Sequence, residues 1–499
     1  MYWLGLDIGT GGTRALLVDA EGRVRHAFTA PHEPMLMQRP LWAEQRPENW
    51  WDAAVAATRG ALAAAGASGQ DVLGVGLSGQ MHGLVMLDAA SAVIRPALIW
   101  CDQRSQAQVD AINAVMGSAA VVAATANPAL TGFTLPKLLW VRDNEPQQFQ
   151  RIRKMLLPKD YVRFRLTGEF ASDVSDASGT ALFDVVHRSW SREMTSRLEI
   201  DASILPPALE SPEVAGTISR AAAAATGLAE GTPVAAGAGD QAASAVGNGI
   251  VETGRVSCTI GTSGVVFAHT EAPAYDPAGR VHTFCHAVPG AWHVMGVTQG
   301  AGLSLQWFRN TLAPGMEYDV LAAEAATAPA GAQGLIWLPY LMGERTPHLD
   351  ATARGGWVGL TAKHTRADMI RAILEGVSYS QKDGLDIIEG MGVRADSVRL
   401  SGGGARSAFW RQMFADVFGK PAVMLKTEEG SAYGAALLAL VATREYASVR
   451  EVCRAVIRES ATLTPDPEAV NVYRHGHRLY GSLYPALSAF YRSLDSGMK

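Results

Sequence analysis

The sequence predicts an α/β protein of two related domains that face each other across a cleft, and three observations support this prediction. The chain has 499 residues, which is too long for a single core. Residues 7–14, Asp-Ile-Gly-Thr-Gly-Gly-Thr-Arg, form a glycine-rich turn between two runs of strand-forming residues. Residues 260–264, Ile-Gly-Thr-Ser-Gly, repeat this pattern between two further apolar runs, which indicates a duplicated domain.

The first glycine-rich turn has the composition of an anion-binding loop. Gly9, Gly11 and Gly12 permit a tight turn whose main-chain N–H groups remain open to an anion. Thr10 adds a hydroxyl group, and Arg14 adds a fixed positive charge. A single turn of this kind is more often an ordinary hairpin, so the prediction of a phosphate loop depends on the second copy.

The two copies differ at one position that matters for chemistry. Asp7 ends the first strand, where a carboxylate can hold a hydrated Mg²⁺ ion. The matching position in the second copy is Thr259, so only the first copy offers a carboxylate. Two phosphate loops with one acidic metal site suit a nucleoside triphosphate held between two domains.

Composition excludes several other classes of protein. The chain is 48% hydrophobic and 18% charged, as is typical of a soluble enzyme. A net charge of −5 without a Lys/Arg cluster argues against nucleic acid or an anionic membrane as a partner. The four cysteines have no metal-ligand spacing, which indicates reduced thiols in a cytoplasm. No basic leader and no membrane-length apolar run is found, so we expect a cytoplasmic protein.

Hydrophobic periodicity predicts the elements of the first half. Residues 1–30 indicate a meander of two or three strands. Further strands are expected at 72–77, 84–87, 97–100 and 233–236, and helices at 45–65, 157–166, 219–226 and from 242 onward. The run 74–79 formally matches G-x-G-x-x-G, but a strand follows it instead of a helix, which argues against a dinucleotide site.

Polar residues fill the turn between two of these strands, at residues 78–83. His82 is either a simple turn histidine or a contact to sugar hydroxyls. Gln80 and His82 can both donate and accept hydrogen bonds, which suits the second interpretation.

Asp240 follows a short strand and opens a helix, within Gly-Ala-Gly-Asp-Gln at residues 237–241. Three interpretations stay open from these residues alone. Asp240 can serve as a helix N-cap. The string also matches the dinucleotide fingerprint, although its carboxylate would then face a pyrophosphate and no acidic partner follows about 20 residues later. The third interpretation is a general base that points into the cleft.

The second half has a similar alternation of elements. Strands are expected at 282–286, 293–297, 335–341 and 398–400, and helices at 300–310, 367–388, from 407, at 431–441, and at 486–494 after a bend at Pro485. A strand, the triplet Gly402–Gly404 and a helix form a third nucleotide-type element, because glycines permit close approach to a flat ring or an anion. The spacing of four histidines, at 269, 282, 286 and 293, fits no compact metal site.

Taken together, these segments resemble the carbohydrate kinases of the FGGY family, which have an actin-like ATPase (ribonuclease H-like) fold. Residues 132–144 and 355–375 are similar to the two signature segments of that family, and the similarity extends from residue 1 to about 490. It implies an N-terminal domain over 1–249 with the sugar site and a C-terminal domain over 250–499 with the adenosine site.

Four further segments resemble the branch of the family that phosphorylates the ketose D-xylulose during xylose catabolism. These are residues 79–83, 157–161, 167–173 and 343–348. Three positions depart from the common pattern of that branch: Gln241 and Cys101 replace Asn, and Gly12 replaces Ser. The resemblance thus implies ATP and D-xylulose as partners, and the sequence leaves a homodimer open.

The resemblance also assigns roles to individual residues. Asp240 is expected to accept the proton of the substrate hydroxyl, and Asp7 to hold Mg²⁺, mostly through water. We expect ATP phosphates to contact Thr10, Arg14 and Thr262, the nucleotide pocket to be lined by Gly302, Gln306, Gly404 and Ala405, and the ketose to contact Met81, His82, Asp240 and Gln241.

Three alternatives remain. The nearest is a kinase for another ketose or polyol, such as ribulose. The second is a nucleotide-driven switch without sugar chemistry, like actin, although such a protein has no reason to place Gln80 and His82 beside Asp240. The third, a dinucleotide oxidoreductase, lacks the acidic partner described above.

Overall fold

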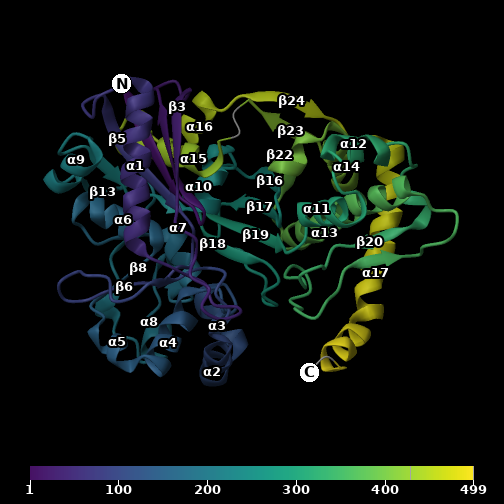
Figure 1. The fold of residues 1–499 in the computed structure, drawn as a ribbon, viewed down its shortest axis with the longest axis horizontal. Helices are drawn as coiled ribbons and strands as arrows, with labels where there is room; N and C mark the ends of the chain where they lie inside the picture. Colours follow the sequence, from purple (N-terminus) through teal and green to yellow (C-terminus); the bar gives the residue numbers. More distant parts are fainter. Residues whose placement is uncertain (427–428, 498–499) are drawn as a thin grey trace.

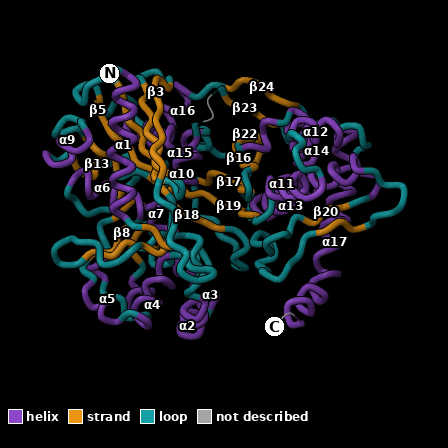
Figure 2. Tube along the Cα trace, in the orientation of Figure 1, coloured by secondary structure: helices purple, strands orange, loops and turns teal. Residues whose placement is uncertain are grey.

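The computed structural model describes residues 1–426 and 429–497, and it contains two large mixed β-sheets flanked by helices (Figure 1). The first sheet has the order β13 (Val214–Thr217), β14 (Pro233–Ala235), β5 (Val72–Gly79), β1 (Tyr2–Ile8), β2 (Gly12–Val18), β3 (Val24–Pro31), with β15 (Ala238–Gly239) also paired to β5. The second has the order β18 (His282–Cys285), β19 (Trp292–Thr298), β17 (Gly264–Thr270), β16 (Gly254–Ile260), β22 (Ala395–Ser401), β23 (Ala422–Leu425), β24 (Glu459–Leu463). Figure 2 shows the strands gathered in two groups with helices around them.

The two sheets repeat one topology, which confirms the predicted duplication. β1 pairs antiparallel with β2 and parallel with β5, and β16 pairs antiparallel with β17 and parallel with β22. The register is also repeated, because Asp7 lies opposite Ser78 and Thr259 lies opposite Ser401. The residues aligned from the sequence therefore occupy equivalent positions at the carboxyl ends of equivalent strands.

Short strands and helices complete the first half. The short strands are β4 (Glu44–Gln45), β6 (Val85–Leu87), β7 (Ala97–Leu98), β8 (Lys154–Leu156), β9 (Ser172–Asp173), β10 (Phe183–Asp184), β11 (Ser189–Trp190) and β12 (Ala208–Leu209). The helices are α1 (Pro47–Ala65), α2 (Gln106–Met116), α3 (Ser118–Thr125), α4 (Thr134–Asn144), α5 (Pro146–Arg151), α6 (Pro158–Thr167), α7 (Val174–Ala177), α8 (Arg192–Arg197), α9 (Arg220–Thr226) and α10 (Asp240–Gly247). Helix α1 packs on β2 and β3 through a buried stripe that includes Trp50, Ala54 and Ala61.

The second half contains β20 (Ile336–Leu338), β21 (Gly356–Val358), and helices α11 (Gly302–Leu312), α12 (Tyr318–Ala325), α13 (Arg366–Gly390), α14 (Ala408–Phe418), α15 (Gly430–Ala442), α16 (Val449–Val456) and α17 (Pro467–Gly497). The long helix α13 begins at a capping box, in which Thr365 and Asp368 satisfy each other's main-chain N–H groups. It is buried between β20 and the second sheet. The helices predicted at 45–65, 157–166, 219–226 and 367–388 are thereby confirmed.

Helix α15 belongs to the second half of the sequence but packs against the first sheet. In Figure 1 its yellow-green ribbon lies among the purple strands of the N-terminus. Close approach is possible because the strands are glycine-rich there: a Cβ on Gly5 would lie 2.0 Å from the Ala432 carbonyl oxygen, and one on Gly76 would lie 1.9 Å from that of Ala435. Helices α15 and α16 therefore share a core with elements from the first half.

The predicted terminal helix at 486–494 is part of a longer one, so that prediction was wrong about where the helix begins. Helix α17 starts at Pro467 and continues through Pro485. A proline removes one main-chain hydrogen bond, but packing can retain the helix around it. Tyr473, Tyr480 and Tyr491 supply that packing, because all three are buried against the second half. No single helix in the described ranges is long and apolar enough to cross a membrane.

Candidate active site

Two carboxylates lie at the same edge of the first sheet. β1, β5 and β15 run parallel there, with Asp7 opposite Ser78 and Ser78 opposite Ala238. Asp240 follows two residues after Ala238 as the first residue of α10. The Ser78 hydroxyl donates a hydrogen bond of 2.9 Å to Asp7 Oδ1, which fixes that carboxylate against the sheet. The parallel strands thus place Asp7 and Asp240 beside each other, as the carboxyl ends of such strands do.

The environment of these carboxylates favours their protonated forms. Burial, and to a smaller extent the charge of Asp7, raise the pKa of Asp240 to about 7 against the opposing effect of hydrogen bonds from Gln241. Burial also raises the pKa of Asp7, although Ser78 and Arg14 oppose the shift. Neither carboxylate forms an ion pair with any described residue. The paired oxygens therefore suit a divalent cation such as Mg²⁺, which would offset their repulsion.

The two glycine-rich turns present similar donors. Gly9 N–H and Gly261 N–H each close their own turn, at 3.0 and 3.1 Å. The main-chain N–H groups of residues 10–11 and 262–263 have no hydrogen-bond partner in the described part of the chain. Unpaired N–H groups at the tip of a tight turn form a concave donor surface for an anion. Both turns are thus equipped to bind phosphate.

The residues predicted to line a nucleotide pocket gather around the second turn. Gly302 N–H donates 2.8 Å to the carbonyl of Gly261. A Cβ on Gly404 would lie 2.4 Å from the side chain of Ile260, so the triple-glycine segment packs directly on this turn. Gln306 is exposed on α11, and Ala405 is buried behind the segment. The structure thus brings Gly302 and Gly404 to the second turn, while the contacts of all four residues to ATP stay a prediction.

The hydroxyl of Thr10 already forms hydrogen bonds with two other side chains. It accepts a hydrogen bond of 2.9 Å from Trp100 Nε1 and donates one of 3.3 Å to Gln80 Oε1. Gln80 is buried, and its amide nitrogen donates to the carbonyl of Gly9 and to Gln45 Oε1. The amide of Gln80 therefore holds the first turn, and its contact with a sugar hydroxyl stays a prediction.

His82 adopts a backbone conformation that non-glycine residues rarely adopt, with φ of +69°. Its ring stacks on Phe133 at 4.7 Å, and Nδ1–H donates 2.7 Å to the carbonyl of Gly179. Burial lowers the pKa of His82 to about 3, so the ring is neutral and Nε2 carries a free lone pair. Met81 is buried against Gly239, next to Asp240.

The main-chain carbonyl of His82 is held by a residue that we did not predict. Lys137 Nζ donates 2.9 Å to this carbonyl and 2.6 Å to that of Gly132, and Thr134 Oγ1 donates 3.1 Å to the carbonyl of His82. The side chain of Lys137 is completely buried, and burial lowers its pKa to about 7. Lys137 lies within the segment 132–144, which carried the resemblance, but its contact with His82 has no signal in the sequence.

Arg14 is paired across the molecule. Its guanidinium contacts Glu429 Oε2 at 2.6 and 3.0 Å, at the start of α15, and it donates 3.1 Å to the hydroxyl of Thr29. A contact between Arg14 and a phosphate would have to share or replace this pair. The predicted role of Arg14 thus depends on how strongly Glu429 competes.

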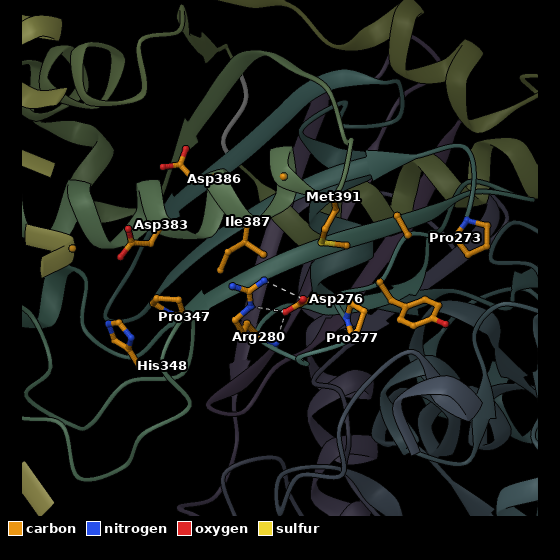
Figure 3. Close-up of a pocket in the computed structure, with 14 residues that line it drawn as sticks. Pro273, Asp276, Pro277, Arg280, Pro347, His348, Asp383, Asp386, Ile387 and Met391 are labelled. Carbon is orange, nitrogen blue, oxygen red and sulfur yellow. Dashed lines mark hydrogen bonds and ion pairs between the residues drawn. The ribbon is translucent and has the colours of Figure 1, made fainter. Parts of the chain in front are cut away.

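A large pocket of about 910 Å³ lies elsewhere on the second half (Figure 3). Its acidic side chains are already paired: Asp276 with Arg280 at 2.8 Å, and Asp383 with His477 at 2.7 Å. Neither glycine-rich turn reaches it, and none of the predicted site residues lines it. The pocket therefore does not mark the candidate active site.

Comparison with known proteins agrees with the family resemblance that the sequence indicates. Residues 2–247 match the FGGY family of carbohydrate kinases, N-terminal domain, and residues 256–443 match its C-terminal domain. A xylulose kinase of Escherichia coli (strain K12) is 41% identical over 491 residues, which cover 97% of this chain and 99% of that protein. A xylulose kinase of Bacillus subtilis (strain 168) is 38% identical over 483 residues, covering 97% and 96%. The solved xylulose kinase of Rhodospirillum rubrum has a TM-score of 0.92 at 32% identity, covering 99% and 100%.

Proposed function

Because the chain belongs to the FGGY family of carbohydrate kinases, we propose that it uses ATP to phosphorylate D-xylulose to D-xylulose 5-phosphate. The names of the E. coli and B. subtilis relatives support this choice of substrate, since both similarities extend over nearly the whole chain. All four cysteines are free thiols, which fits an enzyme that acts in a reducing cytoplasm.

The observation that carries the proposal is the position of Asp240. Its carboxylate lies at the sheet edge beside Asp7, next to Met81 and on the same side as the first glycine-rich turn. With a pKa raised to about 7, the group is a stronger base than an ordinary carboxylate. Such a group is suited to accept the hydroxyl proton of the sugar as the oxygen attacks phosphorus.

The metal is assigned to Asp7. Mg²⁺, when bound, would neutralise charge on the phosphates, and Asp7 would hold it mostly through water molecules. Neutralising Asp7 also removes one of the influences that keep Asp240 protonated. Metal binding would therefore lower the pKa of the base and increase its ionised fraction at neutral pH.

The two glycine-rich turns are assigned to the phosphates of ATP. Phosphoryl transfer has a loose transition state, so the protein must mainly align the reactants and neutralise charge. The free N–H groups of residues 10–11 and 262–263 can bind and align the phosphates, so the lysine of a P-loop is not required. Gly302, Gln306, Gly404 and Ala405 would then enclose the nucleoside beside the second turn.

We assign the ketose to the group of residues formed by Met81, His82 and Gln241, next to Asp240. His82 Nε2 can accept a hydrogen bond from a sugar hydroxyl, since the ring is neutral and its Nδ1–H is already used. Gln241, whose amide also contacts Asp240, adds a donor and an acceptor. Met81 provides an apolar wall.

An ADP-release assay tests the proposal. D-xylulose, D-ribulose, L-ribulose and glycerol are compared at equal concentrations, with Asp240→Asn as the control variant. We expect D-xylulose to give the highest kcat/KM, and Asp240→Asn to remove the sugar-dependent signal. Preference for a ribulose would change the substrate but retain the reaction, whereas ADP release that no sugar stimulates would favour a nucleotide-driven switch.

A further inference from the structure

Five charged side chains are buried together behind the strand that leads to Asp240. They are Lys159, Asp160, Arg163, Asp173 and Asp176, and each is at most 1% exposed. Lys159 Nζ lies 2.6 Å from Asp160 Oδ1, 2.6 Å from Asp173 Oδ2 and 3.1 Å from Asp176 Oδ2. The ammonium group therefore lies between three carboxylates whose oxygens are close enough to one another to be ligands of a single metal ion.

Such a cluster is a poor way to stabilise a fold, because removing charges from water offsets most of their attraction. Its contacts suggest another purpose. Arg163 Nη1 donates 2.7 Å to the carbonyl of Ala236, and Asp173 accepts a hydrogen bond from the hydroxyl of Ser175. The same hydroxyl oxygen accepts one of 3.1 Å from the N–H of Gly239, the residue before Asp240.

We propose that Ser175 is a positioning residue for Asp240, and that it transmits the fixed geometry of the buried charge cluster to the main chain beside the base. This inference rests on the proposed function, in which Asp240 is the proton acceptor. It assigns to Ser175 a part in catalysis without contact to either substrate.

The hydrogen-bond directions explain why a hydroxyl is needed at this position. A serine hydroxyl has one proton and two lone pairs. Because Asp173 accepts the proton, the lone pairs of Ser175 are directed toward Gly239 N–H. Asp173 is itself held by Lys159 through its other oxygen. The orientation of the Gly239 peptide, and with it the start of α10, is thus tied to a rigid buried group.

Removing the hydroxyl tests this role. In Ser175→Ala the buried N–H of Gly239 loses its partner, and the Asp240 carboxylate is free to shift. We expect kcat to fall by about 10- to 100-fold, since a displacement near 1 Å can cost that much. The KM values for sugar and ATP should stay within about twofold, because no substrate contact is removed.

The pH profile separates positioning from a general loss of structure. A displaced Asp240 gains solvent, so the acid limb of the kcat profile should move to lower pH. A smaller folded fraction would lower the amplitude of the profile and leave its midpoint unchanged. Ser175→Cys retains a weak donor and acceptor of similar size, and it should give an intermediate kcat.

Ser211→Ala is the matched control. The hydroxyl of Ser211 also donates to Asp173 Oδ1, at 3.3 Å, but it makes no hydrogen bond to the residue before Asp240. This variant should keep the kcat and the acid limb of the wild type. Equal effects of Ser211→Ala and Ser175→Ala would overturn the inference, because the loss would then come from Asp173 alone.

Asp240→Asn distinguishes failure of the inference from failure of the proposed function. If Asp240→Asn retains sugar-dependent turnover, the proposed function is wrong and Ser175 has no base to position. If Asp240→Asn is inactive while Ser175→Ala has the kcat and acid limb of the wild type, only the inference fails. Should Ser175→Ala not fold, the kcat and acid limb of Ser175→Cys decide in the same way.

Discussion

The carboxylates of Asp7, near the end of β1, and of Asp240, just after β15, lie at the same edge of one sheet, and the charge of Asp7 raises the pKa of Asp240. Burial is the main reason that the pKa of Asp240 rises to about 7, and the charge of Asp7 is the second. A cation that neutralised Asp7 would remove the second of these causes and lower the pKa of Asp240. The pair would thereby link metal binding to the protonation of the group that we propose as the base.

Replacing the base should remove catalysis and leave nucleotide binding. We expect Asp240→Asn to lower kcat by about 10²–10⁴-fold, the usual contribution of a positioned general base. Binding of ATP should persist, since both glycine-rich turns are intact. Calorimetric titration with ATP, next to the ADP-release assay, checks both parts. Turnover equal to that of the wild type would remove Asp240 from the mechanism.

The same substitution should stabilise the protein at high pH. The pKa of Asp240 is raised to about 7 in the folded state from an ordinary value of 3.8. Its contribution to stability is therefore fully present below the unfolded pKa and is lost as the pH rises through the folded one. In metal-free buffer at pH 8, Asp240→Asn should exceed the wild type in the free energy of unfolding, by at most about 4 kcal/mol.

This difference should shrink as the pH is lowered from 7 toward 4, because the carboxyl group becomes protonated in both states. Urea unfolding at several pH values, with EDTA present, measures it. If the wild type were as stable as Asp240→Asn at pH 8, the ionised carboxylate of Asp240 would not destabilise the folded state, and the raised pKa would be contradicted.

Removing the charge of Asp7 should affect metal and pH dependence together. We expect Asp7→Asn to need more Mg²⁺ for half-maximal turnover, and its residual activity to have an acid limb at lower pH, because Asp240 then faces no negative neighbour. The control is Thr259→Val, which changes the equivalent position of the second copy. Titration of turnover with Mg²⁺ at several pH values checks this. An unchanged metal requirement in Asp7→Asn would contradict the assignment.

The repeated features of the fold could be predicted from the sequence because they are local. Each glycine-rich turn and its flanking strands occupy fewer than about 20 consecutive residues, and the period of the pattern identifies them. Alignment of the two copies placed Asp7 and Thr259 at equivalent positions, which the strand pairing confirms. The roles of the site residues came from resemblance, and contacts with ligands stay predictions.

Other features depend on contacts between segments that are distant in the sequence, and no local sequence pattern predicts such contacts. Glu429 lies 415 positions from its partner Arg14. The histidines at 269, 286 and 293 are irregularly spaced, yet their rings are in contact, because adjoining strands bring them to the same place. Burial lowers the pKa of each of these rings. Prediction of such clusters requires strand register, which hydrophobic periodicity does not supply.

Lys137 should affect sugar binding through His82. Lys137→Met keeps the length of the side chain and removes both donors, so the strained backbone of His82 loses a charge-assisted hydrogen bond. We expect the KM for the sugar to rise by about tenfold or more, with the KM for ATP unchanged. Thr134→Val removes a neutral bond to the same carbonyl and should have a smaller effect. Steady-state kinetics with each substrate varied would contradict this if only kcat fell.

The pair of Arg14 and Glu429 should compete with ATP. If Arg14 contacts phosphate, Glu429→Gln frees its guanidinium and lowers the KM for ATP. The gain should be at most about fivefold, since a partly exposed ion pair contributes little. Arg14→Gln should raise the same KM. Glu324→Gln breaks a comparable pair, with Arg366 at the start of α13, that involves neither glycine-rich turn, and it serves as the control. A KM for ATP that responds to neither Arg14→Gln nor Glu429→Gln would exclude Arg14 from the phosphate site.

The crossing of α10 and α15 should tolerate no added side chain. A Cβ on Gly434 would lie 1.8 Å from the carbonyl oxygen of Ala243, so the two helices would have to separate. We expect Gly434→Ala to destabilise the protein by about 1–3 kcal/mol, as overpacking does in other cores. Because α10 begins at Asp240, a shift of this helix should also lower kcat.

Gly481→Ala is the matched control, since a Cβ at this position of α17 meets nothing within 4 Å. It should stabilise the protein by up to about 1 kcal/mol through helix propensity alone. Thermal unfolding and kcat of both variants, measured side by side, check the prediction. If Gly434→Ala were as stable as Gly481→Ala, the two helices could not be in contact at Gly434, and the support of Asp240 by α15 would have to be abandoned.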